Sequence, residues 1–84
     1  MPRYLVEAYV PRSRAREARA AERDARAAAK ALVSEGTPVR YVRMTFLPDD
    51  ETCFHIFEAA SDEAVSEACR RARIGSGRIV PAVE

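Results

Sequence analysis

The longest patterned segment of the chain is an alanine-rich stretch over residues 14–35. Small apolar residues recur there at alternating spacings of three and four positions, at Ala18, Ala21, Ala25, Ala28 and Leu32. This spacing predicts one buried face of a long α-helix. Ser13 is the expected N-cap, and Gly36 followed by Pro38 is expected to end the helix. Since alanine side chains are small, the helix axis can approach a sheet closely.

Four strand-like segments accompany this helix and a second, shorter one. They are rich in aromatic and β-branched residues and cover residues 3–10, 39–47, 52–59 and 78–83. Ser61 is expected to cap the second helix, which has arginines near its end. The order strand, helix, strand, strand, helix, strand predicts an α+β fold of the ferredoxin-like βαββαβ type. We expect a single domain over residues 1–84, with two helices on one face of a four-stranded antiparallel sheet.

Alternation within the strands predicts which face of the sheet each side chain occupies. The more apolar set is expected under the helices: Tyr4, Val6, Ala8, Val10, Val42, Met44, Phe46, Phe54 and Ile56. The open face is then expected to carry Leu5, Glu7, Tyr9, Tyr41, Arg43, Thr45, Cys53, His55 and Phe57. Large apolar groups on an open face usually mark an interface. We therefore expect a homodimer in which two sheets pack face to face into a dimeric α/β barrel.

The cleft between the two sheets is the candidate binding site. Its expected ligand-binding residues are Glu7, Tyr9, Tyr41, Arg43 and His55. Because imidazole, thiolate and carboxylate groups bind divalent ions, His55, Cys53 and Glu7 are the candidate metal ligands. The alternative for His55 is a hydrogen-bonded interface residue beside a small thiol. The alternative for Glu7 and Arg43 is a cross-strand ion pair.

The composition excludes several classes of function. The chain has 14 Lys and Arg residues against 13 Asp and Glu residues, a formal net charge of +1, which favours neither a nucleic-acid nor a membrane partner. The apolar runs are too short to span a membrane, and the N-terminus is typical of a strand rather than a signal peptide, so a cytoplasmic location is expected. Cys53 and Cys69 are expected to be reduced thiols. No catalytic nucleophile motif is recognisable, which makes an enzyme the less favoured class.

Several short motifs resemble a known family. The opening MPRYLVE, the strand ending FEA, the segment SDEAVSEACRRA and the closing RI are similar to a family of small bacterial domains of unknown function. That family includes a nickel-binding protein with a dimeric ferredoxin-like fold. The resemblance implies this fold and nickel, or another divalent metal, as cofactor. It also implies a metal-ligating histidine where this chain has Ala68, and a cysteine where it has His55.

The sequence thus predicts a protein that binds a small ligand or a nickel-like divalent metal in the inter-sheet cleft of a homodimer. Two alternatives stay open. One is a cofactor-free enzyme of the monooxygenase or isomerase type, by analogy of fold alone. An enclosed cleft lined by His55 or Glu7 would favour it. The other is a purely structural or interaction dimer.

Overall fold

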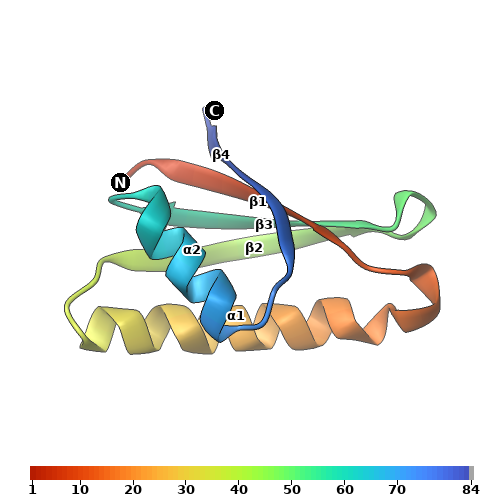
Figure 1. Cartoon of the computed structure of the whole chain (residues 1–84), viewed down its shortest axis with the longest axis horizontal. Helices are drawn as coiled ribbons and strands as arrows, with labels where there is room; N and C mark the ends of the chain where they lie inside the picture. The colour runs from red at the N-terminus through yellow and green to blue at the C-terminus, as the bar shows by residue number, and fades with distance from the viewer. Residues whose placement is uncertain (84) are drawn as a thin grey trace.

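The computed structural model describes residues 1–83, with Ser76 and Gly77 described by their backbone alone. The elements are β1 (Arg3–Tyr9), α1 (Arg16–Ser34), β2 (Val39–Leu47), β3 (Thr52–Ala59), α2 (Asp62–Arg71) and β4 (Ser76–Ala82), with short 3-10 turns η1 (Arg12–Arg14) and η2 (Pro48–Asp50). The strands form one antiparallel sheet in the order β2-β3-β1-β4. Both helices lie on the same face of this sheet (Figure 1). The predicted ferredoxin-like α+β fold is confirmed.

The two helices begin differently. Ser61 caps α2 as predicted, because its Oγ accepts a hydrogen bond from the Ala64 N–H at 3.3 Å. The prediction that Ser13 caps α1 is wrong. Ser13 lies in η1, which the Arg14 N–H closes onto the Pro11 carbonyl, and α1 begins after Ala15 without a side-chain cap. The first turn of α1 therefore has less local support than that of α2.

The apolar faces of both helices are buried, and on α1 they follow the predicted stripe except for the half-buried Ala21. On α1 the buried residues are Ala18, Ala25, Ala28, Ala29 and Leu32, and on α2 they are Ala64, Val65, Ala68 and Cys69. Most of these side chains belong to one core cluster with Val6 and Phe57 of the sheet. Within the described residues, neither helix has an apolar stretch long enough to cross a membrane.

The predicted side-chain faces are wrong in two strands. In β3 the buried residues are Cys53, His55, Phe57 and Ala59, so Phe54 and Ile56 point to the open face instead. Apolar side chains lie on both faces of β3, because it is an internal strand. Alternation alone therefore does not distinguish its two faces.

A β-bulge explains the error in β2. The pairing with β3 shifts between Tyr41 and Arg43, so that Tyr41 opposes Phe57 whereas Met44 opposes His55. The bulge adds one residue to β2 and reverses the phase of alternation that follows it. Tyr41 and Met44 consequently both face the helices, although strict alternation places them on opposite sides. Tyr41 is buried and Met44 is half-buried.

Candidate metal centre

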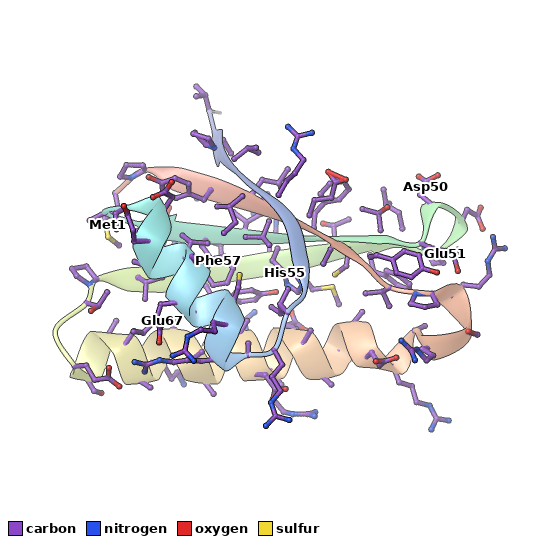
Figure 2. All side chains as sticks on the ribbon, viewed as in Figure 1. Met1, Asp50, Glu51, His55, Phe57 and Glu67 are labelled. Carbon is purple, nitrogen blue, oxygen red and sulfur yellow. The ribbon has the colours of Figure 1, made fainter. Side chains whose placement is uncertain are left out.

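His55 lies at the middle of a hydrogen-bonded cluster between the sheet and α1. Its side chain is 1% exposed, and Figure 2 shows it in the layer between the strands and the helices. The Tyr41 hydroxyl lies 2.7 Å from Nδ1, and the Cys53 thiol sulfur lies 3.5 Å from Nε2. Both nitrogens of the ring therefore have a partner, one on β2 and one on β3.

The cluster extends to a fourth side chain, Met44. The Cys53 thiol donates a hydrogen bond to the Met44 thioether, with a sulfur–sulfur distance of 3.7 Å. Because this bond uses the single thiol proton, the ring proton of neutral His55 is assigned to Nε2, which donates to Cys53. Nδ1 then accepts from the Tyr41 hydroxyl. We call these four residues, Tyr41, Met44, Cys53 and His55, the buried cluster.

Burial keeps the cluster uncharged at neutral pH. Desolvation lowers the pKa of His55 to about 4, and the nearby Glu22 carboxylate of α1 opposes this shift. Desolvation also raises the pKa of Tyr41 and of the Cys53 thiol, and Glu22 adds to both shifts. The imidazole, the phenol and the thiol are therefore all neutral, and the cluster buries no net charge of its own.

The structure divides the predicted site residues between two places. Tyr41, Cys53 and His55 lie together under the helices, which is not the face on which the sequence placed them. Glu7 and Arg43 do lie on the open face, since Glu7 opposes the outward-facing Phe54 and Arg43 opposes Ile56. The sheet separates Glu7 from His55 and Cys53, so the three cannot ligate one ion within one chain.

Two further placements concern Tyr9 and the predicted pair of Glu7 and Arg43. Tyr9, at the end of β1, is 70% exposed. Glu7 and Arg43 are not cross-strand neighbours, because β3 lies between their strands, and the residue opposite Glu7 on β4 is Arg78.

Sequence reasoning missed two residues of this region, Met44 and Glu22. Alternation places Met44 on the helix side but Cys53 and His55 on the opposite face, which conceals their proximity. Glu22 carries no such signal, since it lies outside the apolar stripe of α1. The one signal in the sequence was the alternative phase of β3, in which Cys53, His55 and Phe57 face inward together.

A groove of about 840 Å³ lies between α1 and the edge strand β2, beside the buried cluster. Its lining is apolar with basic residues and comprises Met1, Arg26, Ala29, Lys30, Val33, Ser34, Gly36, Pro38, Val39, Arg40 and Tyr41. The Arg26 guanidinium lies 5.1 Å from the centroid of the Tyr41 ring. Because neither His55 nor Glu7 lines this groove, it gives the enzyme alternative no support.

The fold and the buried cluster define a small ferredoxin-like α+β protein with a group of sulfur and imidazole donors under its longer helix. The chain belongs to the family described as "Nickel responsive protein SCO4226-like", whose pattern matches residues 4–81. It is also similar in fold to the crystal structure of SCO4226 from Streptomyces coelicolor A3(2). That match has 18% sequence identity and a TM-score of 0.63, and it covers 98% of this chain and 99% of the other. No curated protein matches the chain.

The donors of the buried cluster are a poor match to nickel(II). Among residues 1–83, no three His, Cys, Asp or Glu side chains come together in a way that could hold a metal ion. The cluster has three donors only when the Met44 thioether is counted. Nickel(II) is typically held by nitrogen and oxygen donors in tetragonal geometry, whereas thiolate and thioether donors select softer ions.

Proposed function

We propose that this chain is a small metal-binding protein that holds a transition-metal ion at Cys53, His55 and Met44. The observation that carries the proposal is the position of the Cys53 sulfur, 3.5 Å from Nε2 of His55 and 3.7 Å from the sulfur of Met44. Three side chains with metal-binding atoms thus converge in the described part of one chain. The family description supports a response to a metal ion.

Tyr41 and the backbone of β3 would orient the donors. Cys53 and His55 are two positions apart on one strand, so their side chains point to the same face. When Nε2 binds a metal, the ring proton must lie on Nδ1, where the Tyr41 oxygen can accept it. Ligating histidines usually have such a partner at the other nitrogen. The Cys53 thiol would lose its proton on binding, since the thiolate is the ligand.

The first turns of α1 offer a route by which an ion can reach the cluster. Cys53 packs in a small cluster with Val10 and Ala18, separate from the main core, and Met44 is packed against it. The N-terminus of α1 has no side-chain cap, and Ala18 is the buried residue of its first turn. Segments with few apolar contacts open locally at low free-energy cost. The half-buried Met44 would be the first donor reached.

Calorimetric titration of the reduced protein with Ni²⁺, Zn²⁺ and Cu⁺, at a pH where His55 is neutral, tests this function. We expect one ion to bind per chain, and Cys53→Ala and His55→Ala to abolish binding. Cys69→Ala is the matched control, because Cys69 is also buried but lies on α2. If no ion binds to the folded protein, His55 is a hydrogen-bonded core residue and the proposed function is wrong.

We also propose that two copies associate through the open face of the sheet. This face presents the half-buried apolar side chains Leu5, Phe54, Ile56 and Val80, with Glu7, Arg43 and Arg78 among them. Charges of both signs on one apolar face allow the face to complement itself about a two-fold axis. Glu7, Tyr9 and Arg43 would then be the residues that a small ligand meets at the interface.

Ultracentrifugation tests the association. We expect the unmodified protein to sediment as a dimer and Ile56→Glu to sediment as a monomer with unchanged helical content. Val33→Glu is the control, because Val33 is an exposed apolar residue on α1, away from the open face. A monomeric unmodified protein, or a dimer disrupted by Val33→Glu instead, would contradict this interface.

A further inference from the structure

We infer that the centre formed by Met44, Cys53 and His55 selects copper(I), a soft monovalent ion, over nickel(II) and other divalent ions. This inference rests on the proposed metal-binding function and specifies its ligand. It departs from the family description, which names nickel. Donor type, donor spacing and charge support it separately.

The donor type favours a soft ion. Two of the three donors are sulfur atoms, one of them a thioether, and the third is an imidazole nitrogen. Thioether sulfur is a poor ligand for hard divalent ions, whereas thiolate and thioether together are typical ligands of copper(I). No carboxylate is hydrogen-bonded to these three donors in the described residues; the nearest acidic influence is Glu22, whose carboxylate is paired with Arg26 at 3.6 Å.

The donor spacing favours tetrahedral angles. A late first-row metal ion lies about 2.3 Å from a sulfur ligand and about 2.0 Å from a nitrogen ligand. If the ligand–metal–ligand angles are tetrahedral, two sulfur ligands are then about 3.8 Å apart, and a sulfur and a nitrogen ligand are about 3.5 Å apart. Right angles, as in square-planar nickel(II), would give about 3.3 Å and about 3.0 Å. The observed separations are 3.7 Å and 3.5 Å. These two donor pairs would therefore have to move closer together to hold square-planar nickel(II), but not to hold an ion with tetrahedral preference.

The charge distinguishes copper(I) from zinc(II), which also accepts tetrahedral sulfur and nitrogen donors. The thiolate of Cys53 carries one negative charge, while His55 and Met44 are neutral ligands. Copper(I) makes the whole centre neutral, but a divalent ion leaves one net positive charge. Cys53 is 0% exposed and His55 is 1% exposed, and only Met44 is half-buried, so most of that charge would be held away from water at a desolvation cost.

Binding must also conserve protons. The thiol proton of Cys53 leaves for solvent as the sulfur–metal bond forms. His55 loses its proton from Nε2 and gains a proton at Nδ1, so the ring stays neutral. The Nδ1–H group then donates a hydrogen bond to the Tyr41 oxygen. The net change is one proton released for each copper(I) bound, with no change of oxidation state.

Competition between chelator and protein tests the inference. The reduced protein is titrated without oxygen into copper(I) held by bicinchoninate, with excess Ni²⁺ or Zn²⁺ added in parallel samples. We expect one copper(I) to be withdrawn per chain and neither divalent ion to displace it. X-ray absorption should show two sulfur neighbours and one nitrogen neighbour. Met44→Leu should weaken copper(I) retention by more than about tenfold, while Phe46→Leu, in the same strand and cluster, should not.

The outcomes separate this inference from the proposed function. If Ni²⁺ or Zn²⁺ binds through Cys53 and His55 and displaces copper(I), the metal-binding function stands and the copper(I) inference is wrong. An unchanged affinity in Met44→Leu also overturns it. If the folded protein retains none of the three ions, both proposals are wrong.

Discussion

The hydroxyl group of Tyr41 lies 2.7 Å from Nδ1 of His55, and both side chains are buried between the sheet and α1. The Tyr41 ring also packs edge-on against Phe57, with 5.0 Å between the ring centroids. Phenylalanine would keep this ring contact but remove the hydroxyl. We predict that Tyr41→Phe lowers the free energy of unfolding by about 1–3 kcal/mol, because it leaves a buried acceptor without a partner.

Urea unfolding followed by circular dichroism measures this loss. Tyr9→Phe is the matched control, since Tyr9 is 70% exposed and its substitution should have little effect. Equal stability of Tyr41→Phe and the unmodified protein would show that the hydroxyl does not hold His55.

The acid titration of His55 should destabilise the fold below neutral pH. Burial lowers its pKa from the ordinary value of 6.5 to about 4. As pH falls from 6.5, the unfolded chain takes up a proton that the folded chain does not, so the free energy of unfolding decreases, by up to about 3 kcal/mol near pH 4. Above pH 6.5 this contribution is fully present. Hydrogen bonds from arginines lower the pKa of the Glu58 and Glu67 carboxyl groups, that of Glu67 to about 2, so in the folded protein Glu67 titrates below this range.

Two measurements check the prediction. His55 is the one histidine of the chain, so its ring gives a single set of NMR signals whose titration reads the pKa directly. Stability measured between pH 7 and pH 4.5 should show a slope that His55→Gln removes. A folded-state pKa near 6.5 would place the ring in contact with water, and a slope that persists in His55→Gln would assign the pH dependence to other groups.

The two thiols should differ in how quickly they react. Burial raises the pKa of both, that of Cys69 to about 11, so neither is a reactive thiolate in the folded state. If the uncapped N-terminus of α1 opens more readily than the main core, Cys53 will be modified before Cys69. Timed alkylation followed by peptide mass spectrometry gives the order. Modification of Cys69 first would argue against α1 as the route to the buried cluster.

The end of α1 depends on one glycine. Gly36 has φ of 95°, and the Thr37 N–H returns to the Leu32 carbonyl at 2.8 Å. A Cβ at Gly36 would meet nothing within 4 Å, so only backbone strain opposes a side chain there. We predict that Gly36→Ala costs about 1 kcal/mol in thermal or urea unfolding. Gly75→Ala is the control, because Gly75 has equal space and no positive φ, and a similar loss in both variants would refute the strain.

The sequence predicts the elements of this fold better than the faces of its strands. The alanine stripe of α1, the Ser61 cap and the break at Gly36 are local signals, and each is confirmed. The start of α1 was predicted at Ser13 because serine favours N-caps. The turn η1 after Pro11 takes Ser13 instead and delays the helix.

The buried cluster could not be predicted by alternation, for two physical reasons. A bulge between Tyr41 and Arg43 reverses the phase of β2, and no glycine or proline in that segment signals it. In β3 the inward set and the outward set are both apolar, so the hydrophobic pattern does not choose between them. Alternation does place Cys53 and His55 on one shared face of β3, and only the choice of face is wrong.

The methyl and imidazole NMR signals of the reduced protein, recorded as one equivalent of copper(I) is added, test the metal centre most directly. The chain has two methionines, Met1 and Met44, and one histidine, so each signal is assigned with few variants. Met1 is 62% exposed and serves as an internal control. We predict that the signals of Met44 and His55 shift together and saturate at one ion per chain, while Met1 stays unchanged. If copper(I) binds while the Met44 and His55 signals stay where they are, or does not bind to the folded chain, these residues form no metal centre.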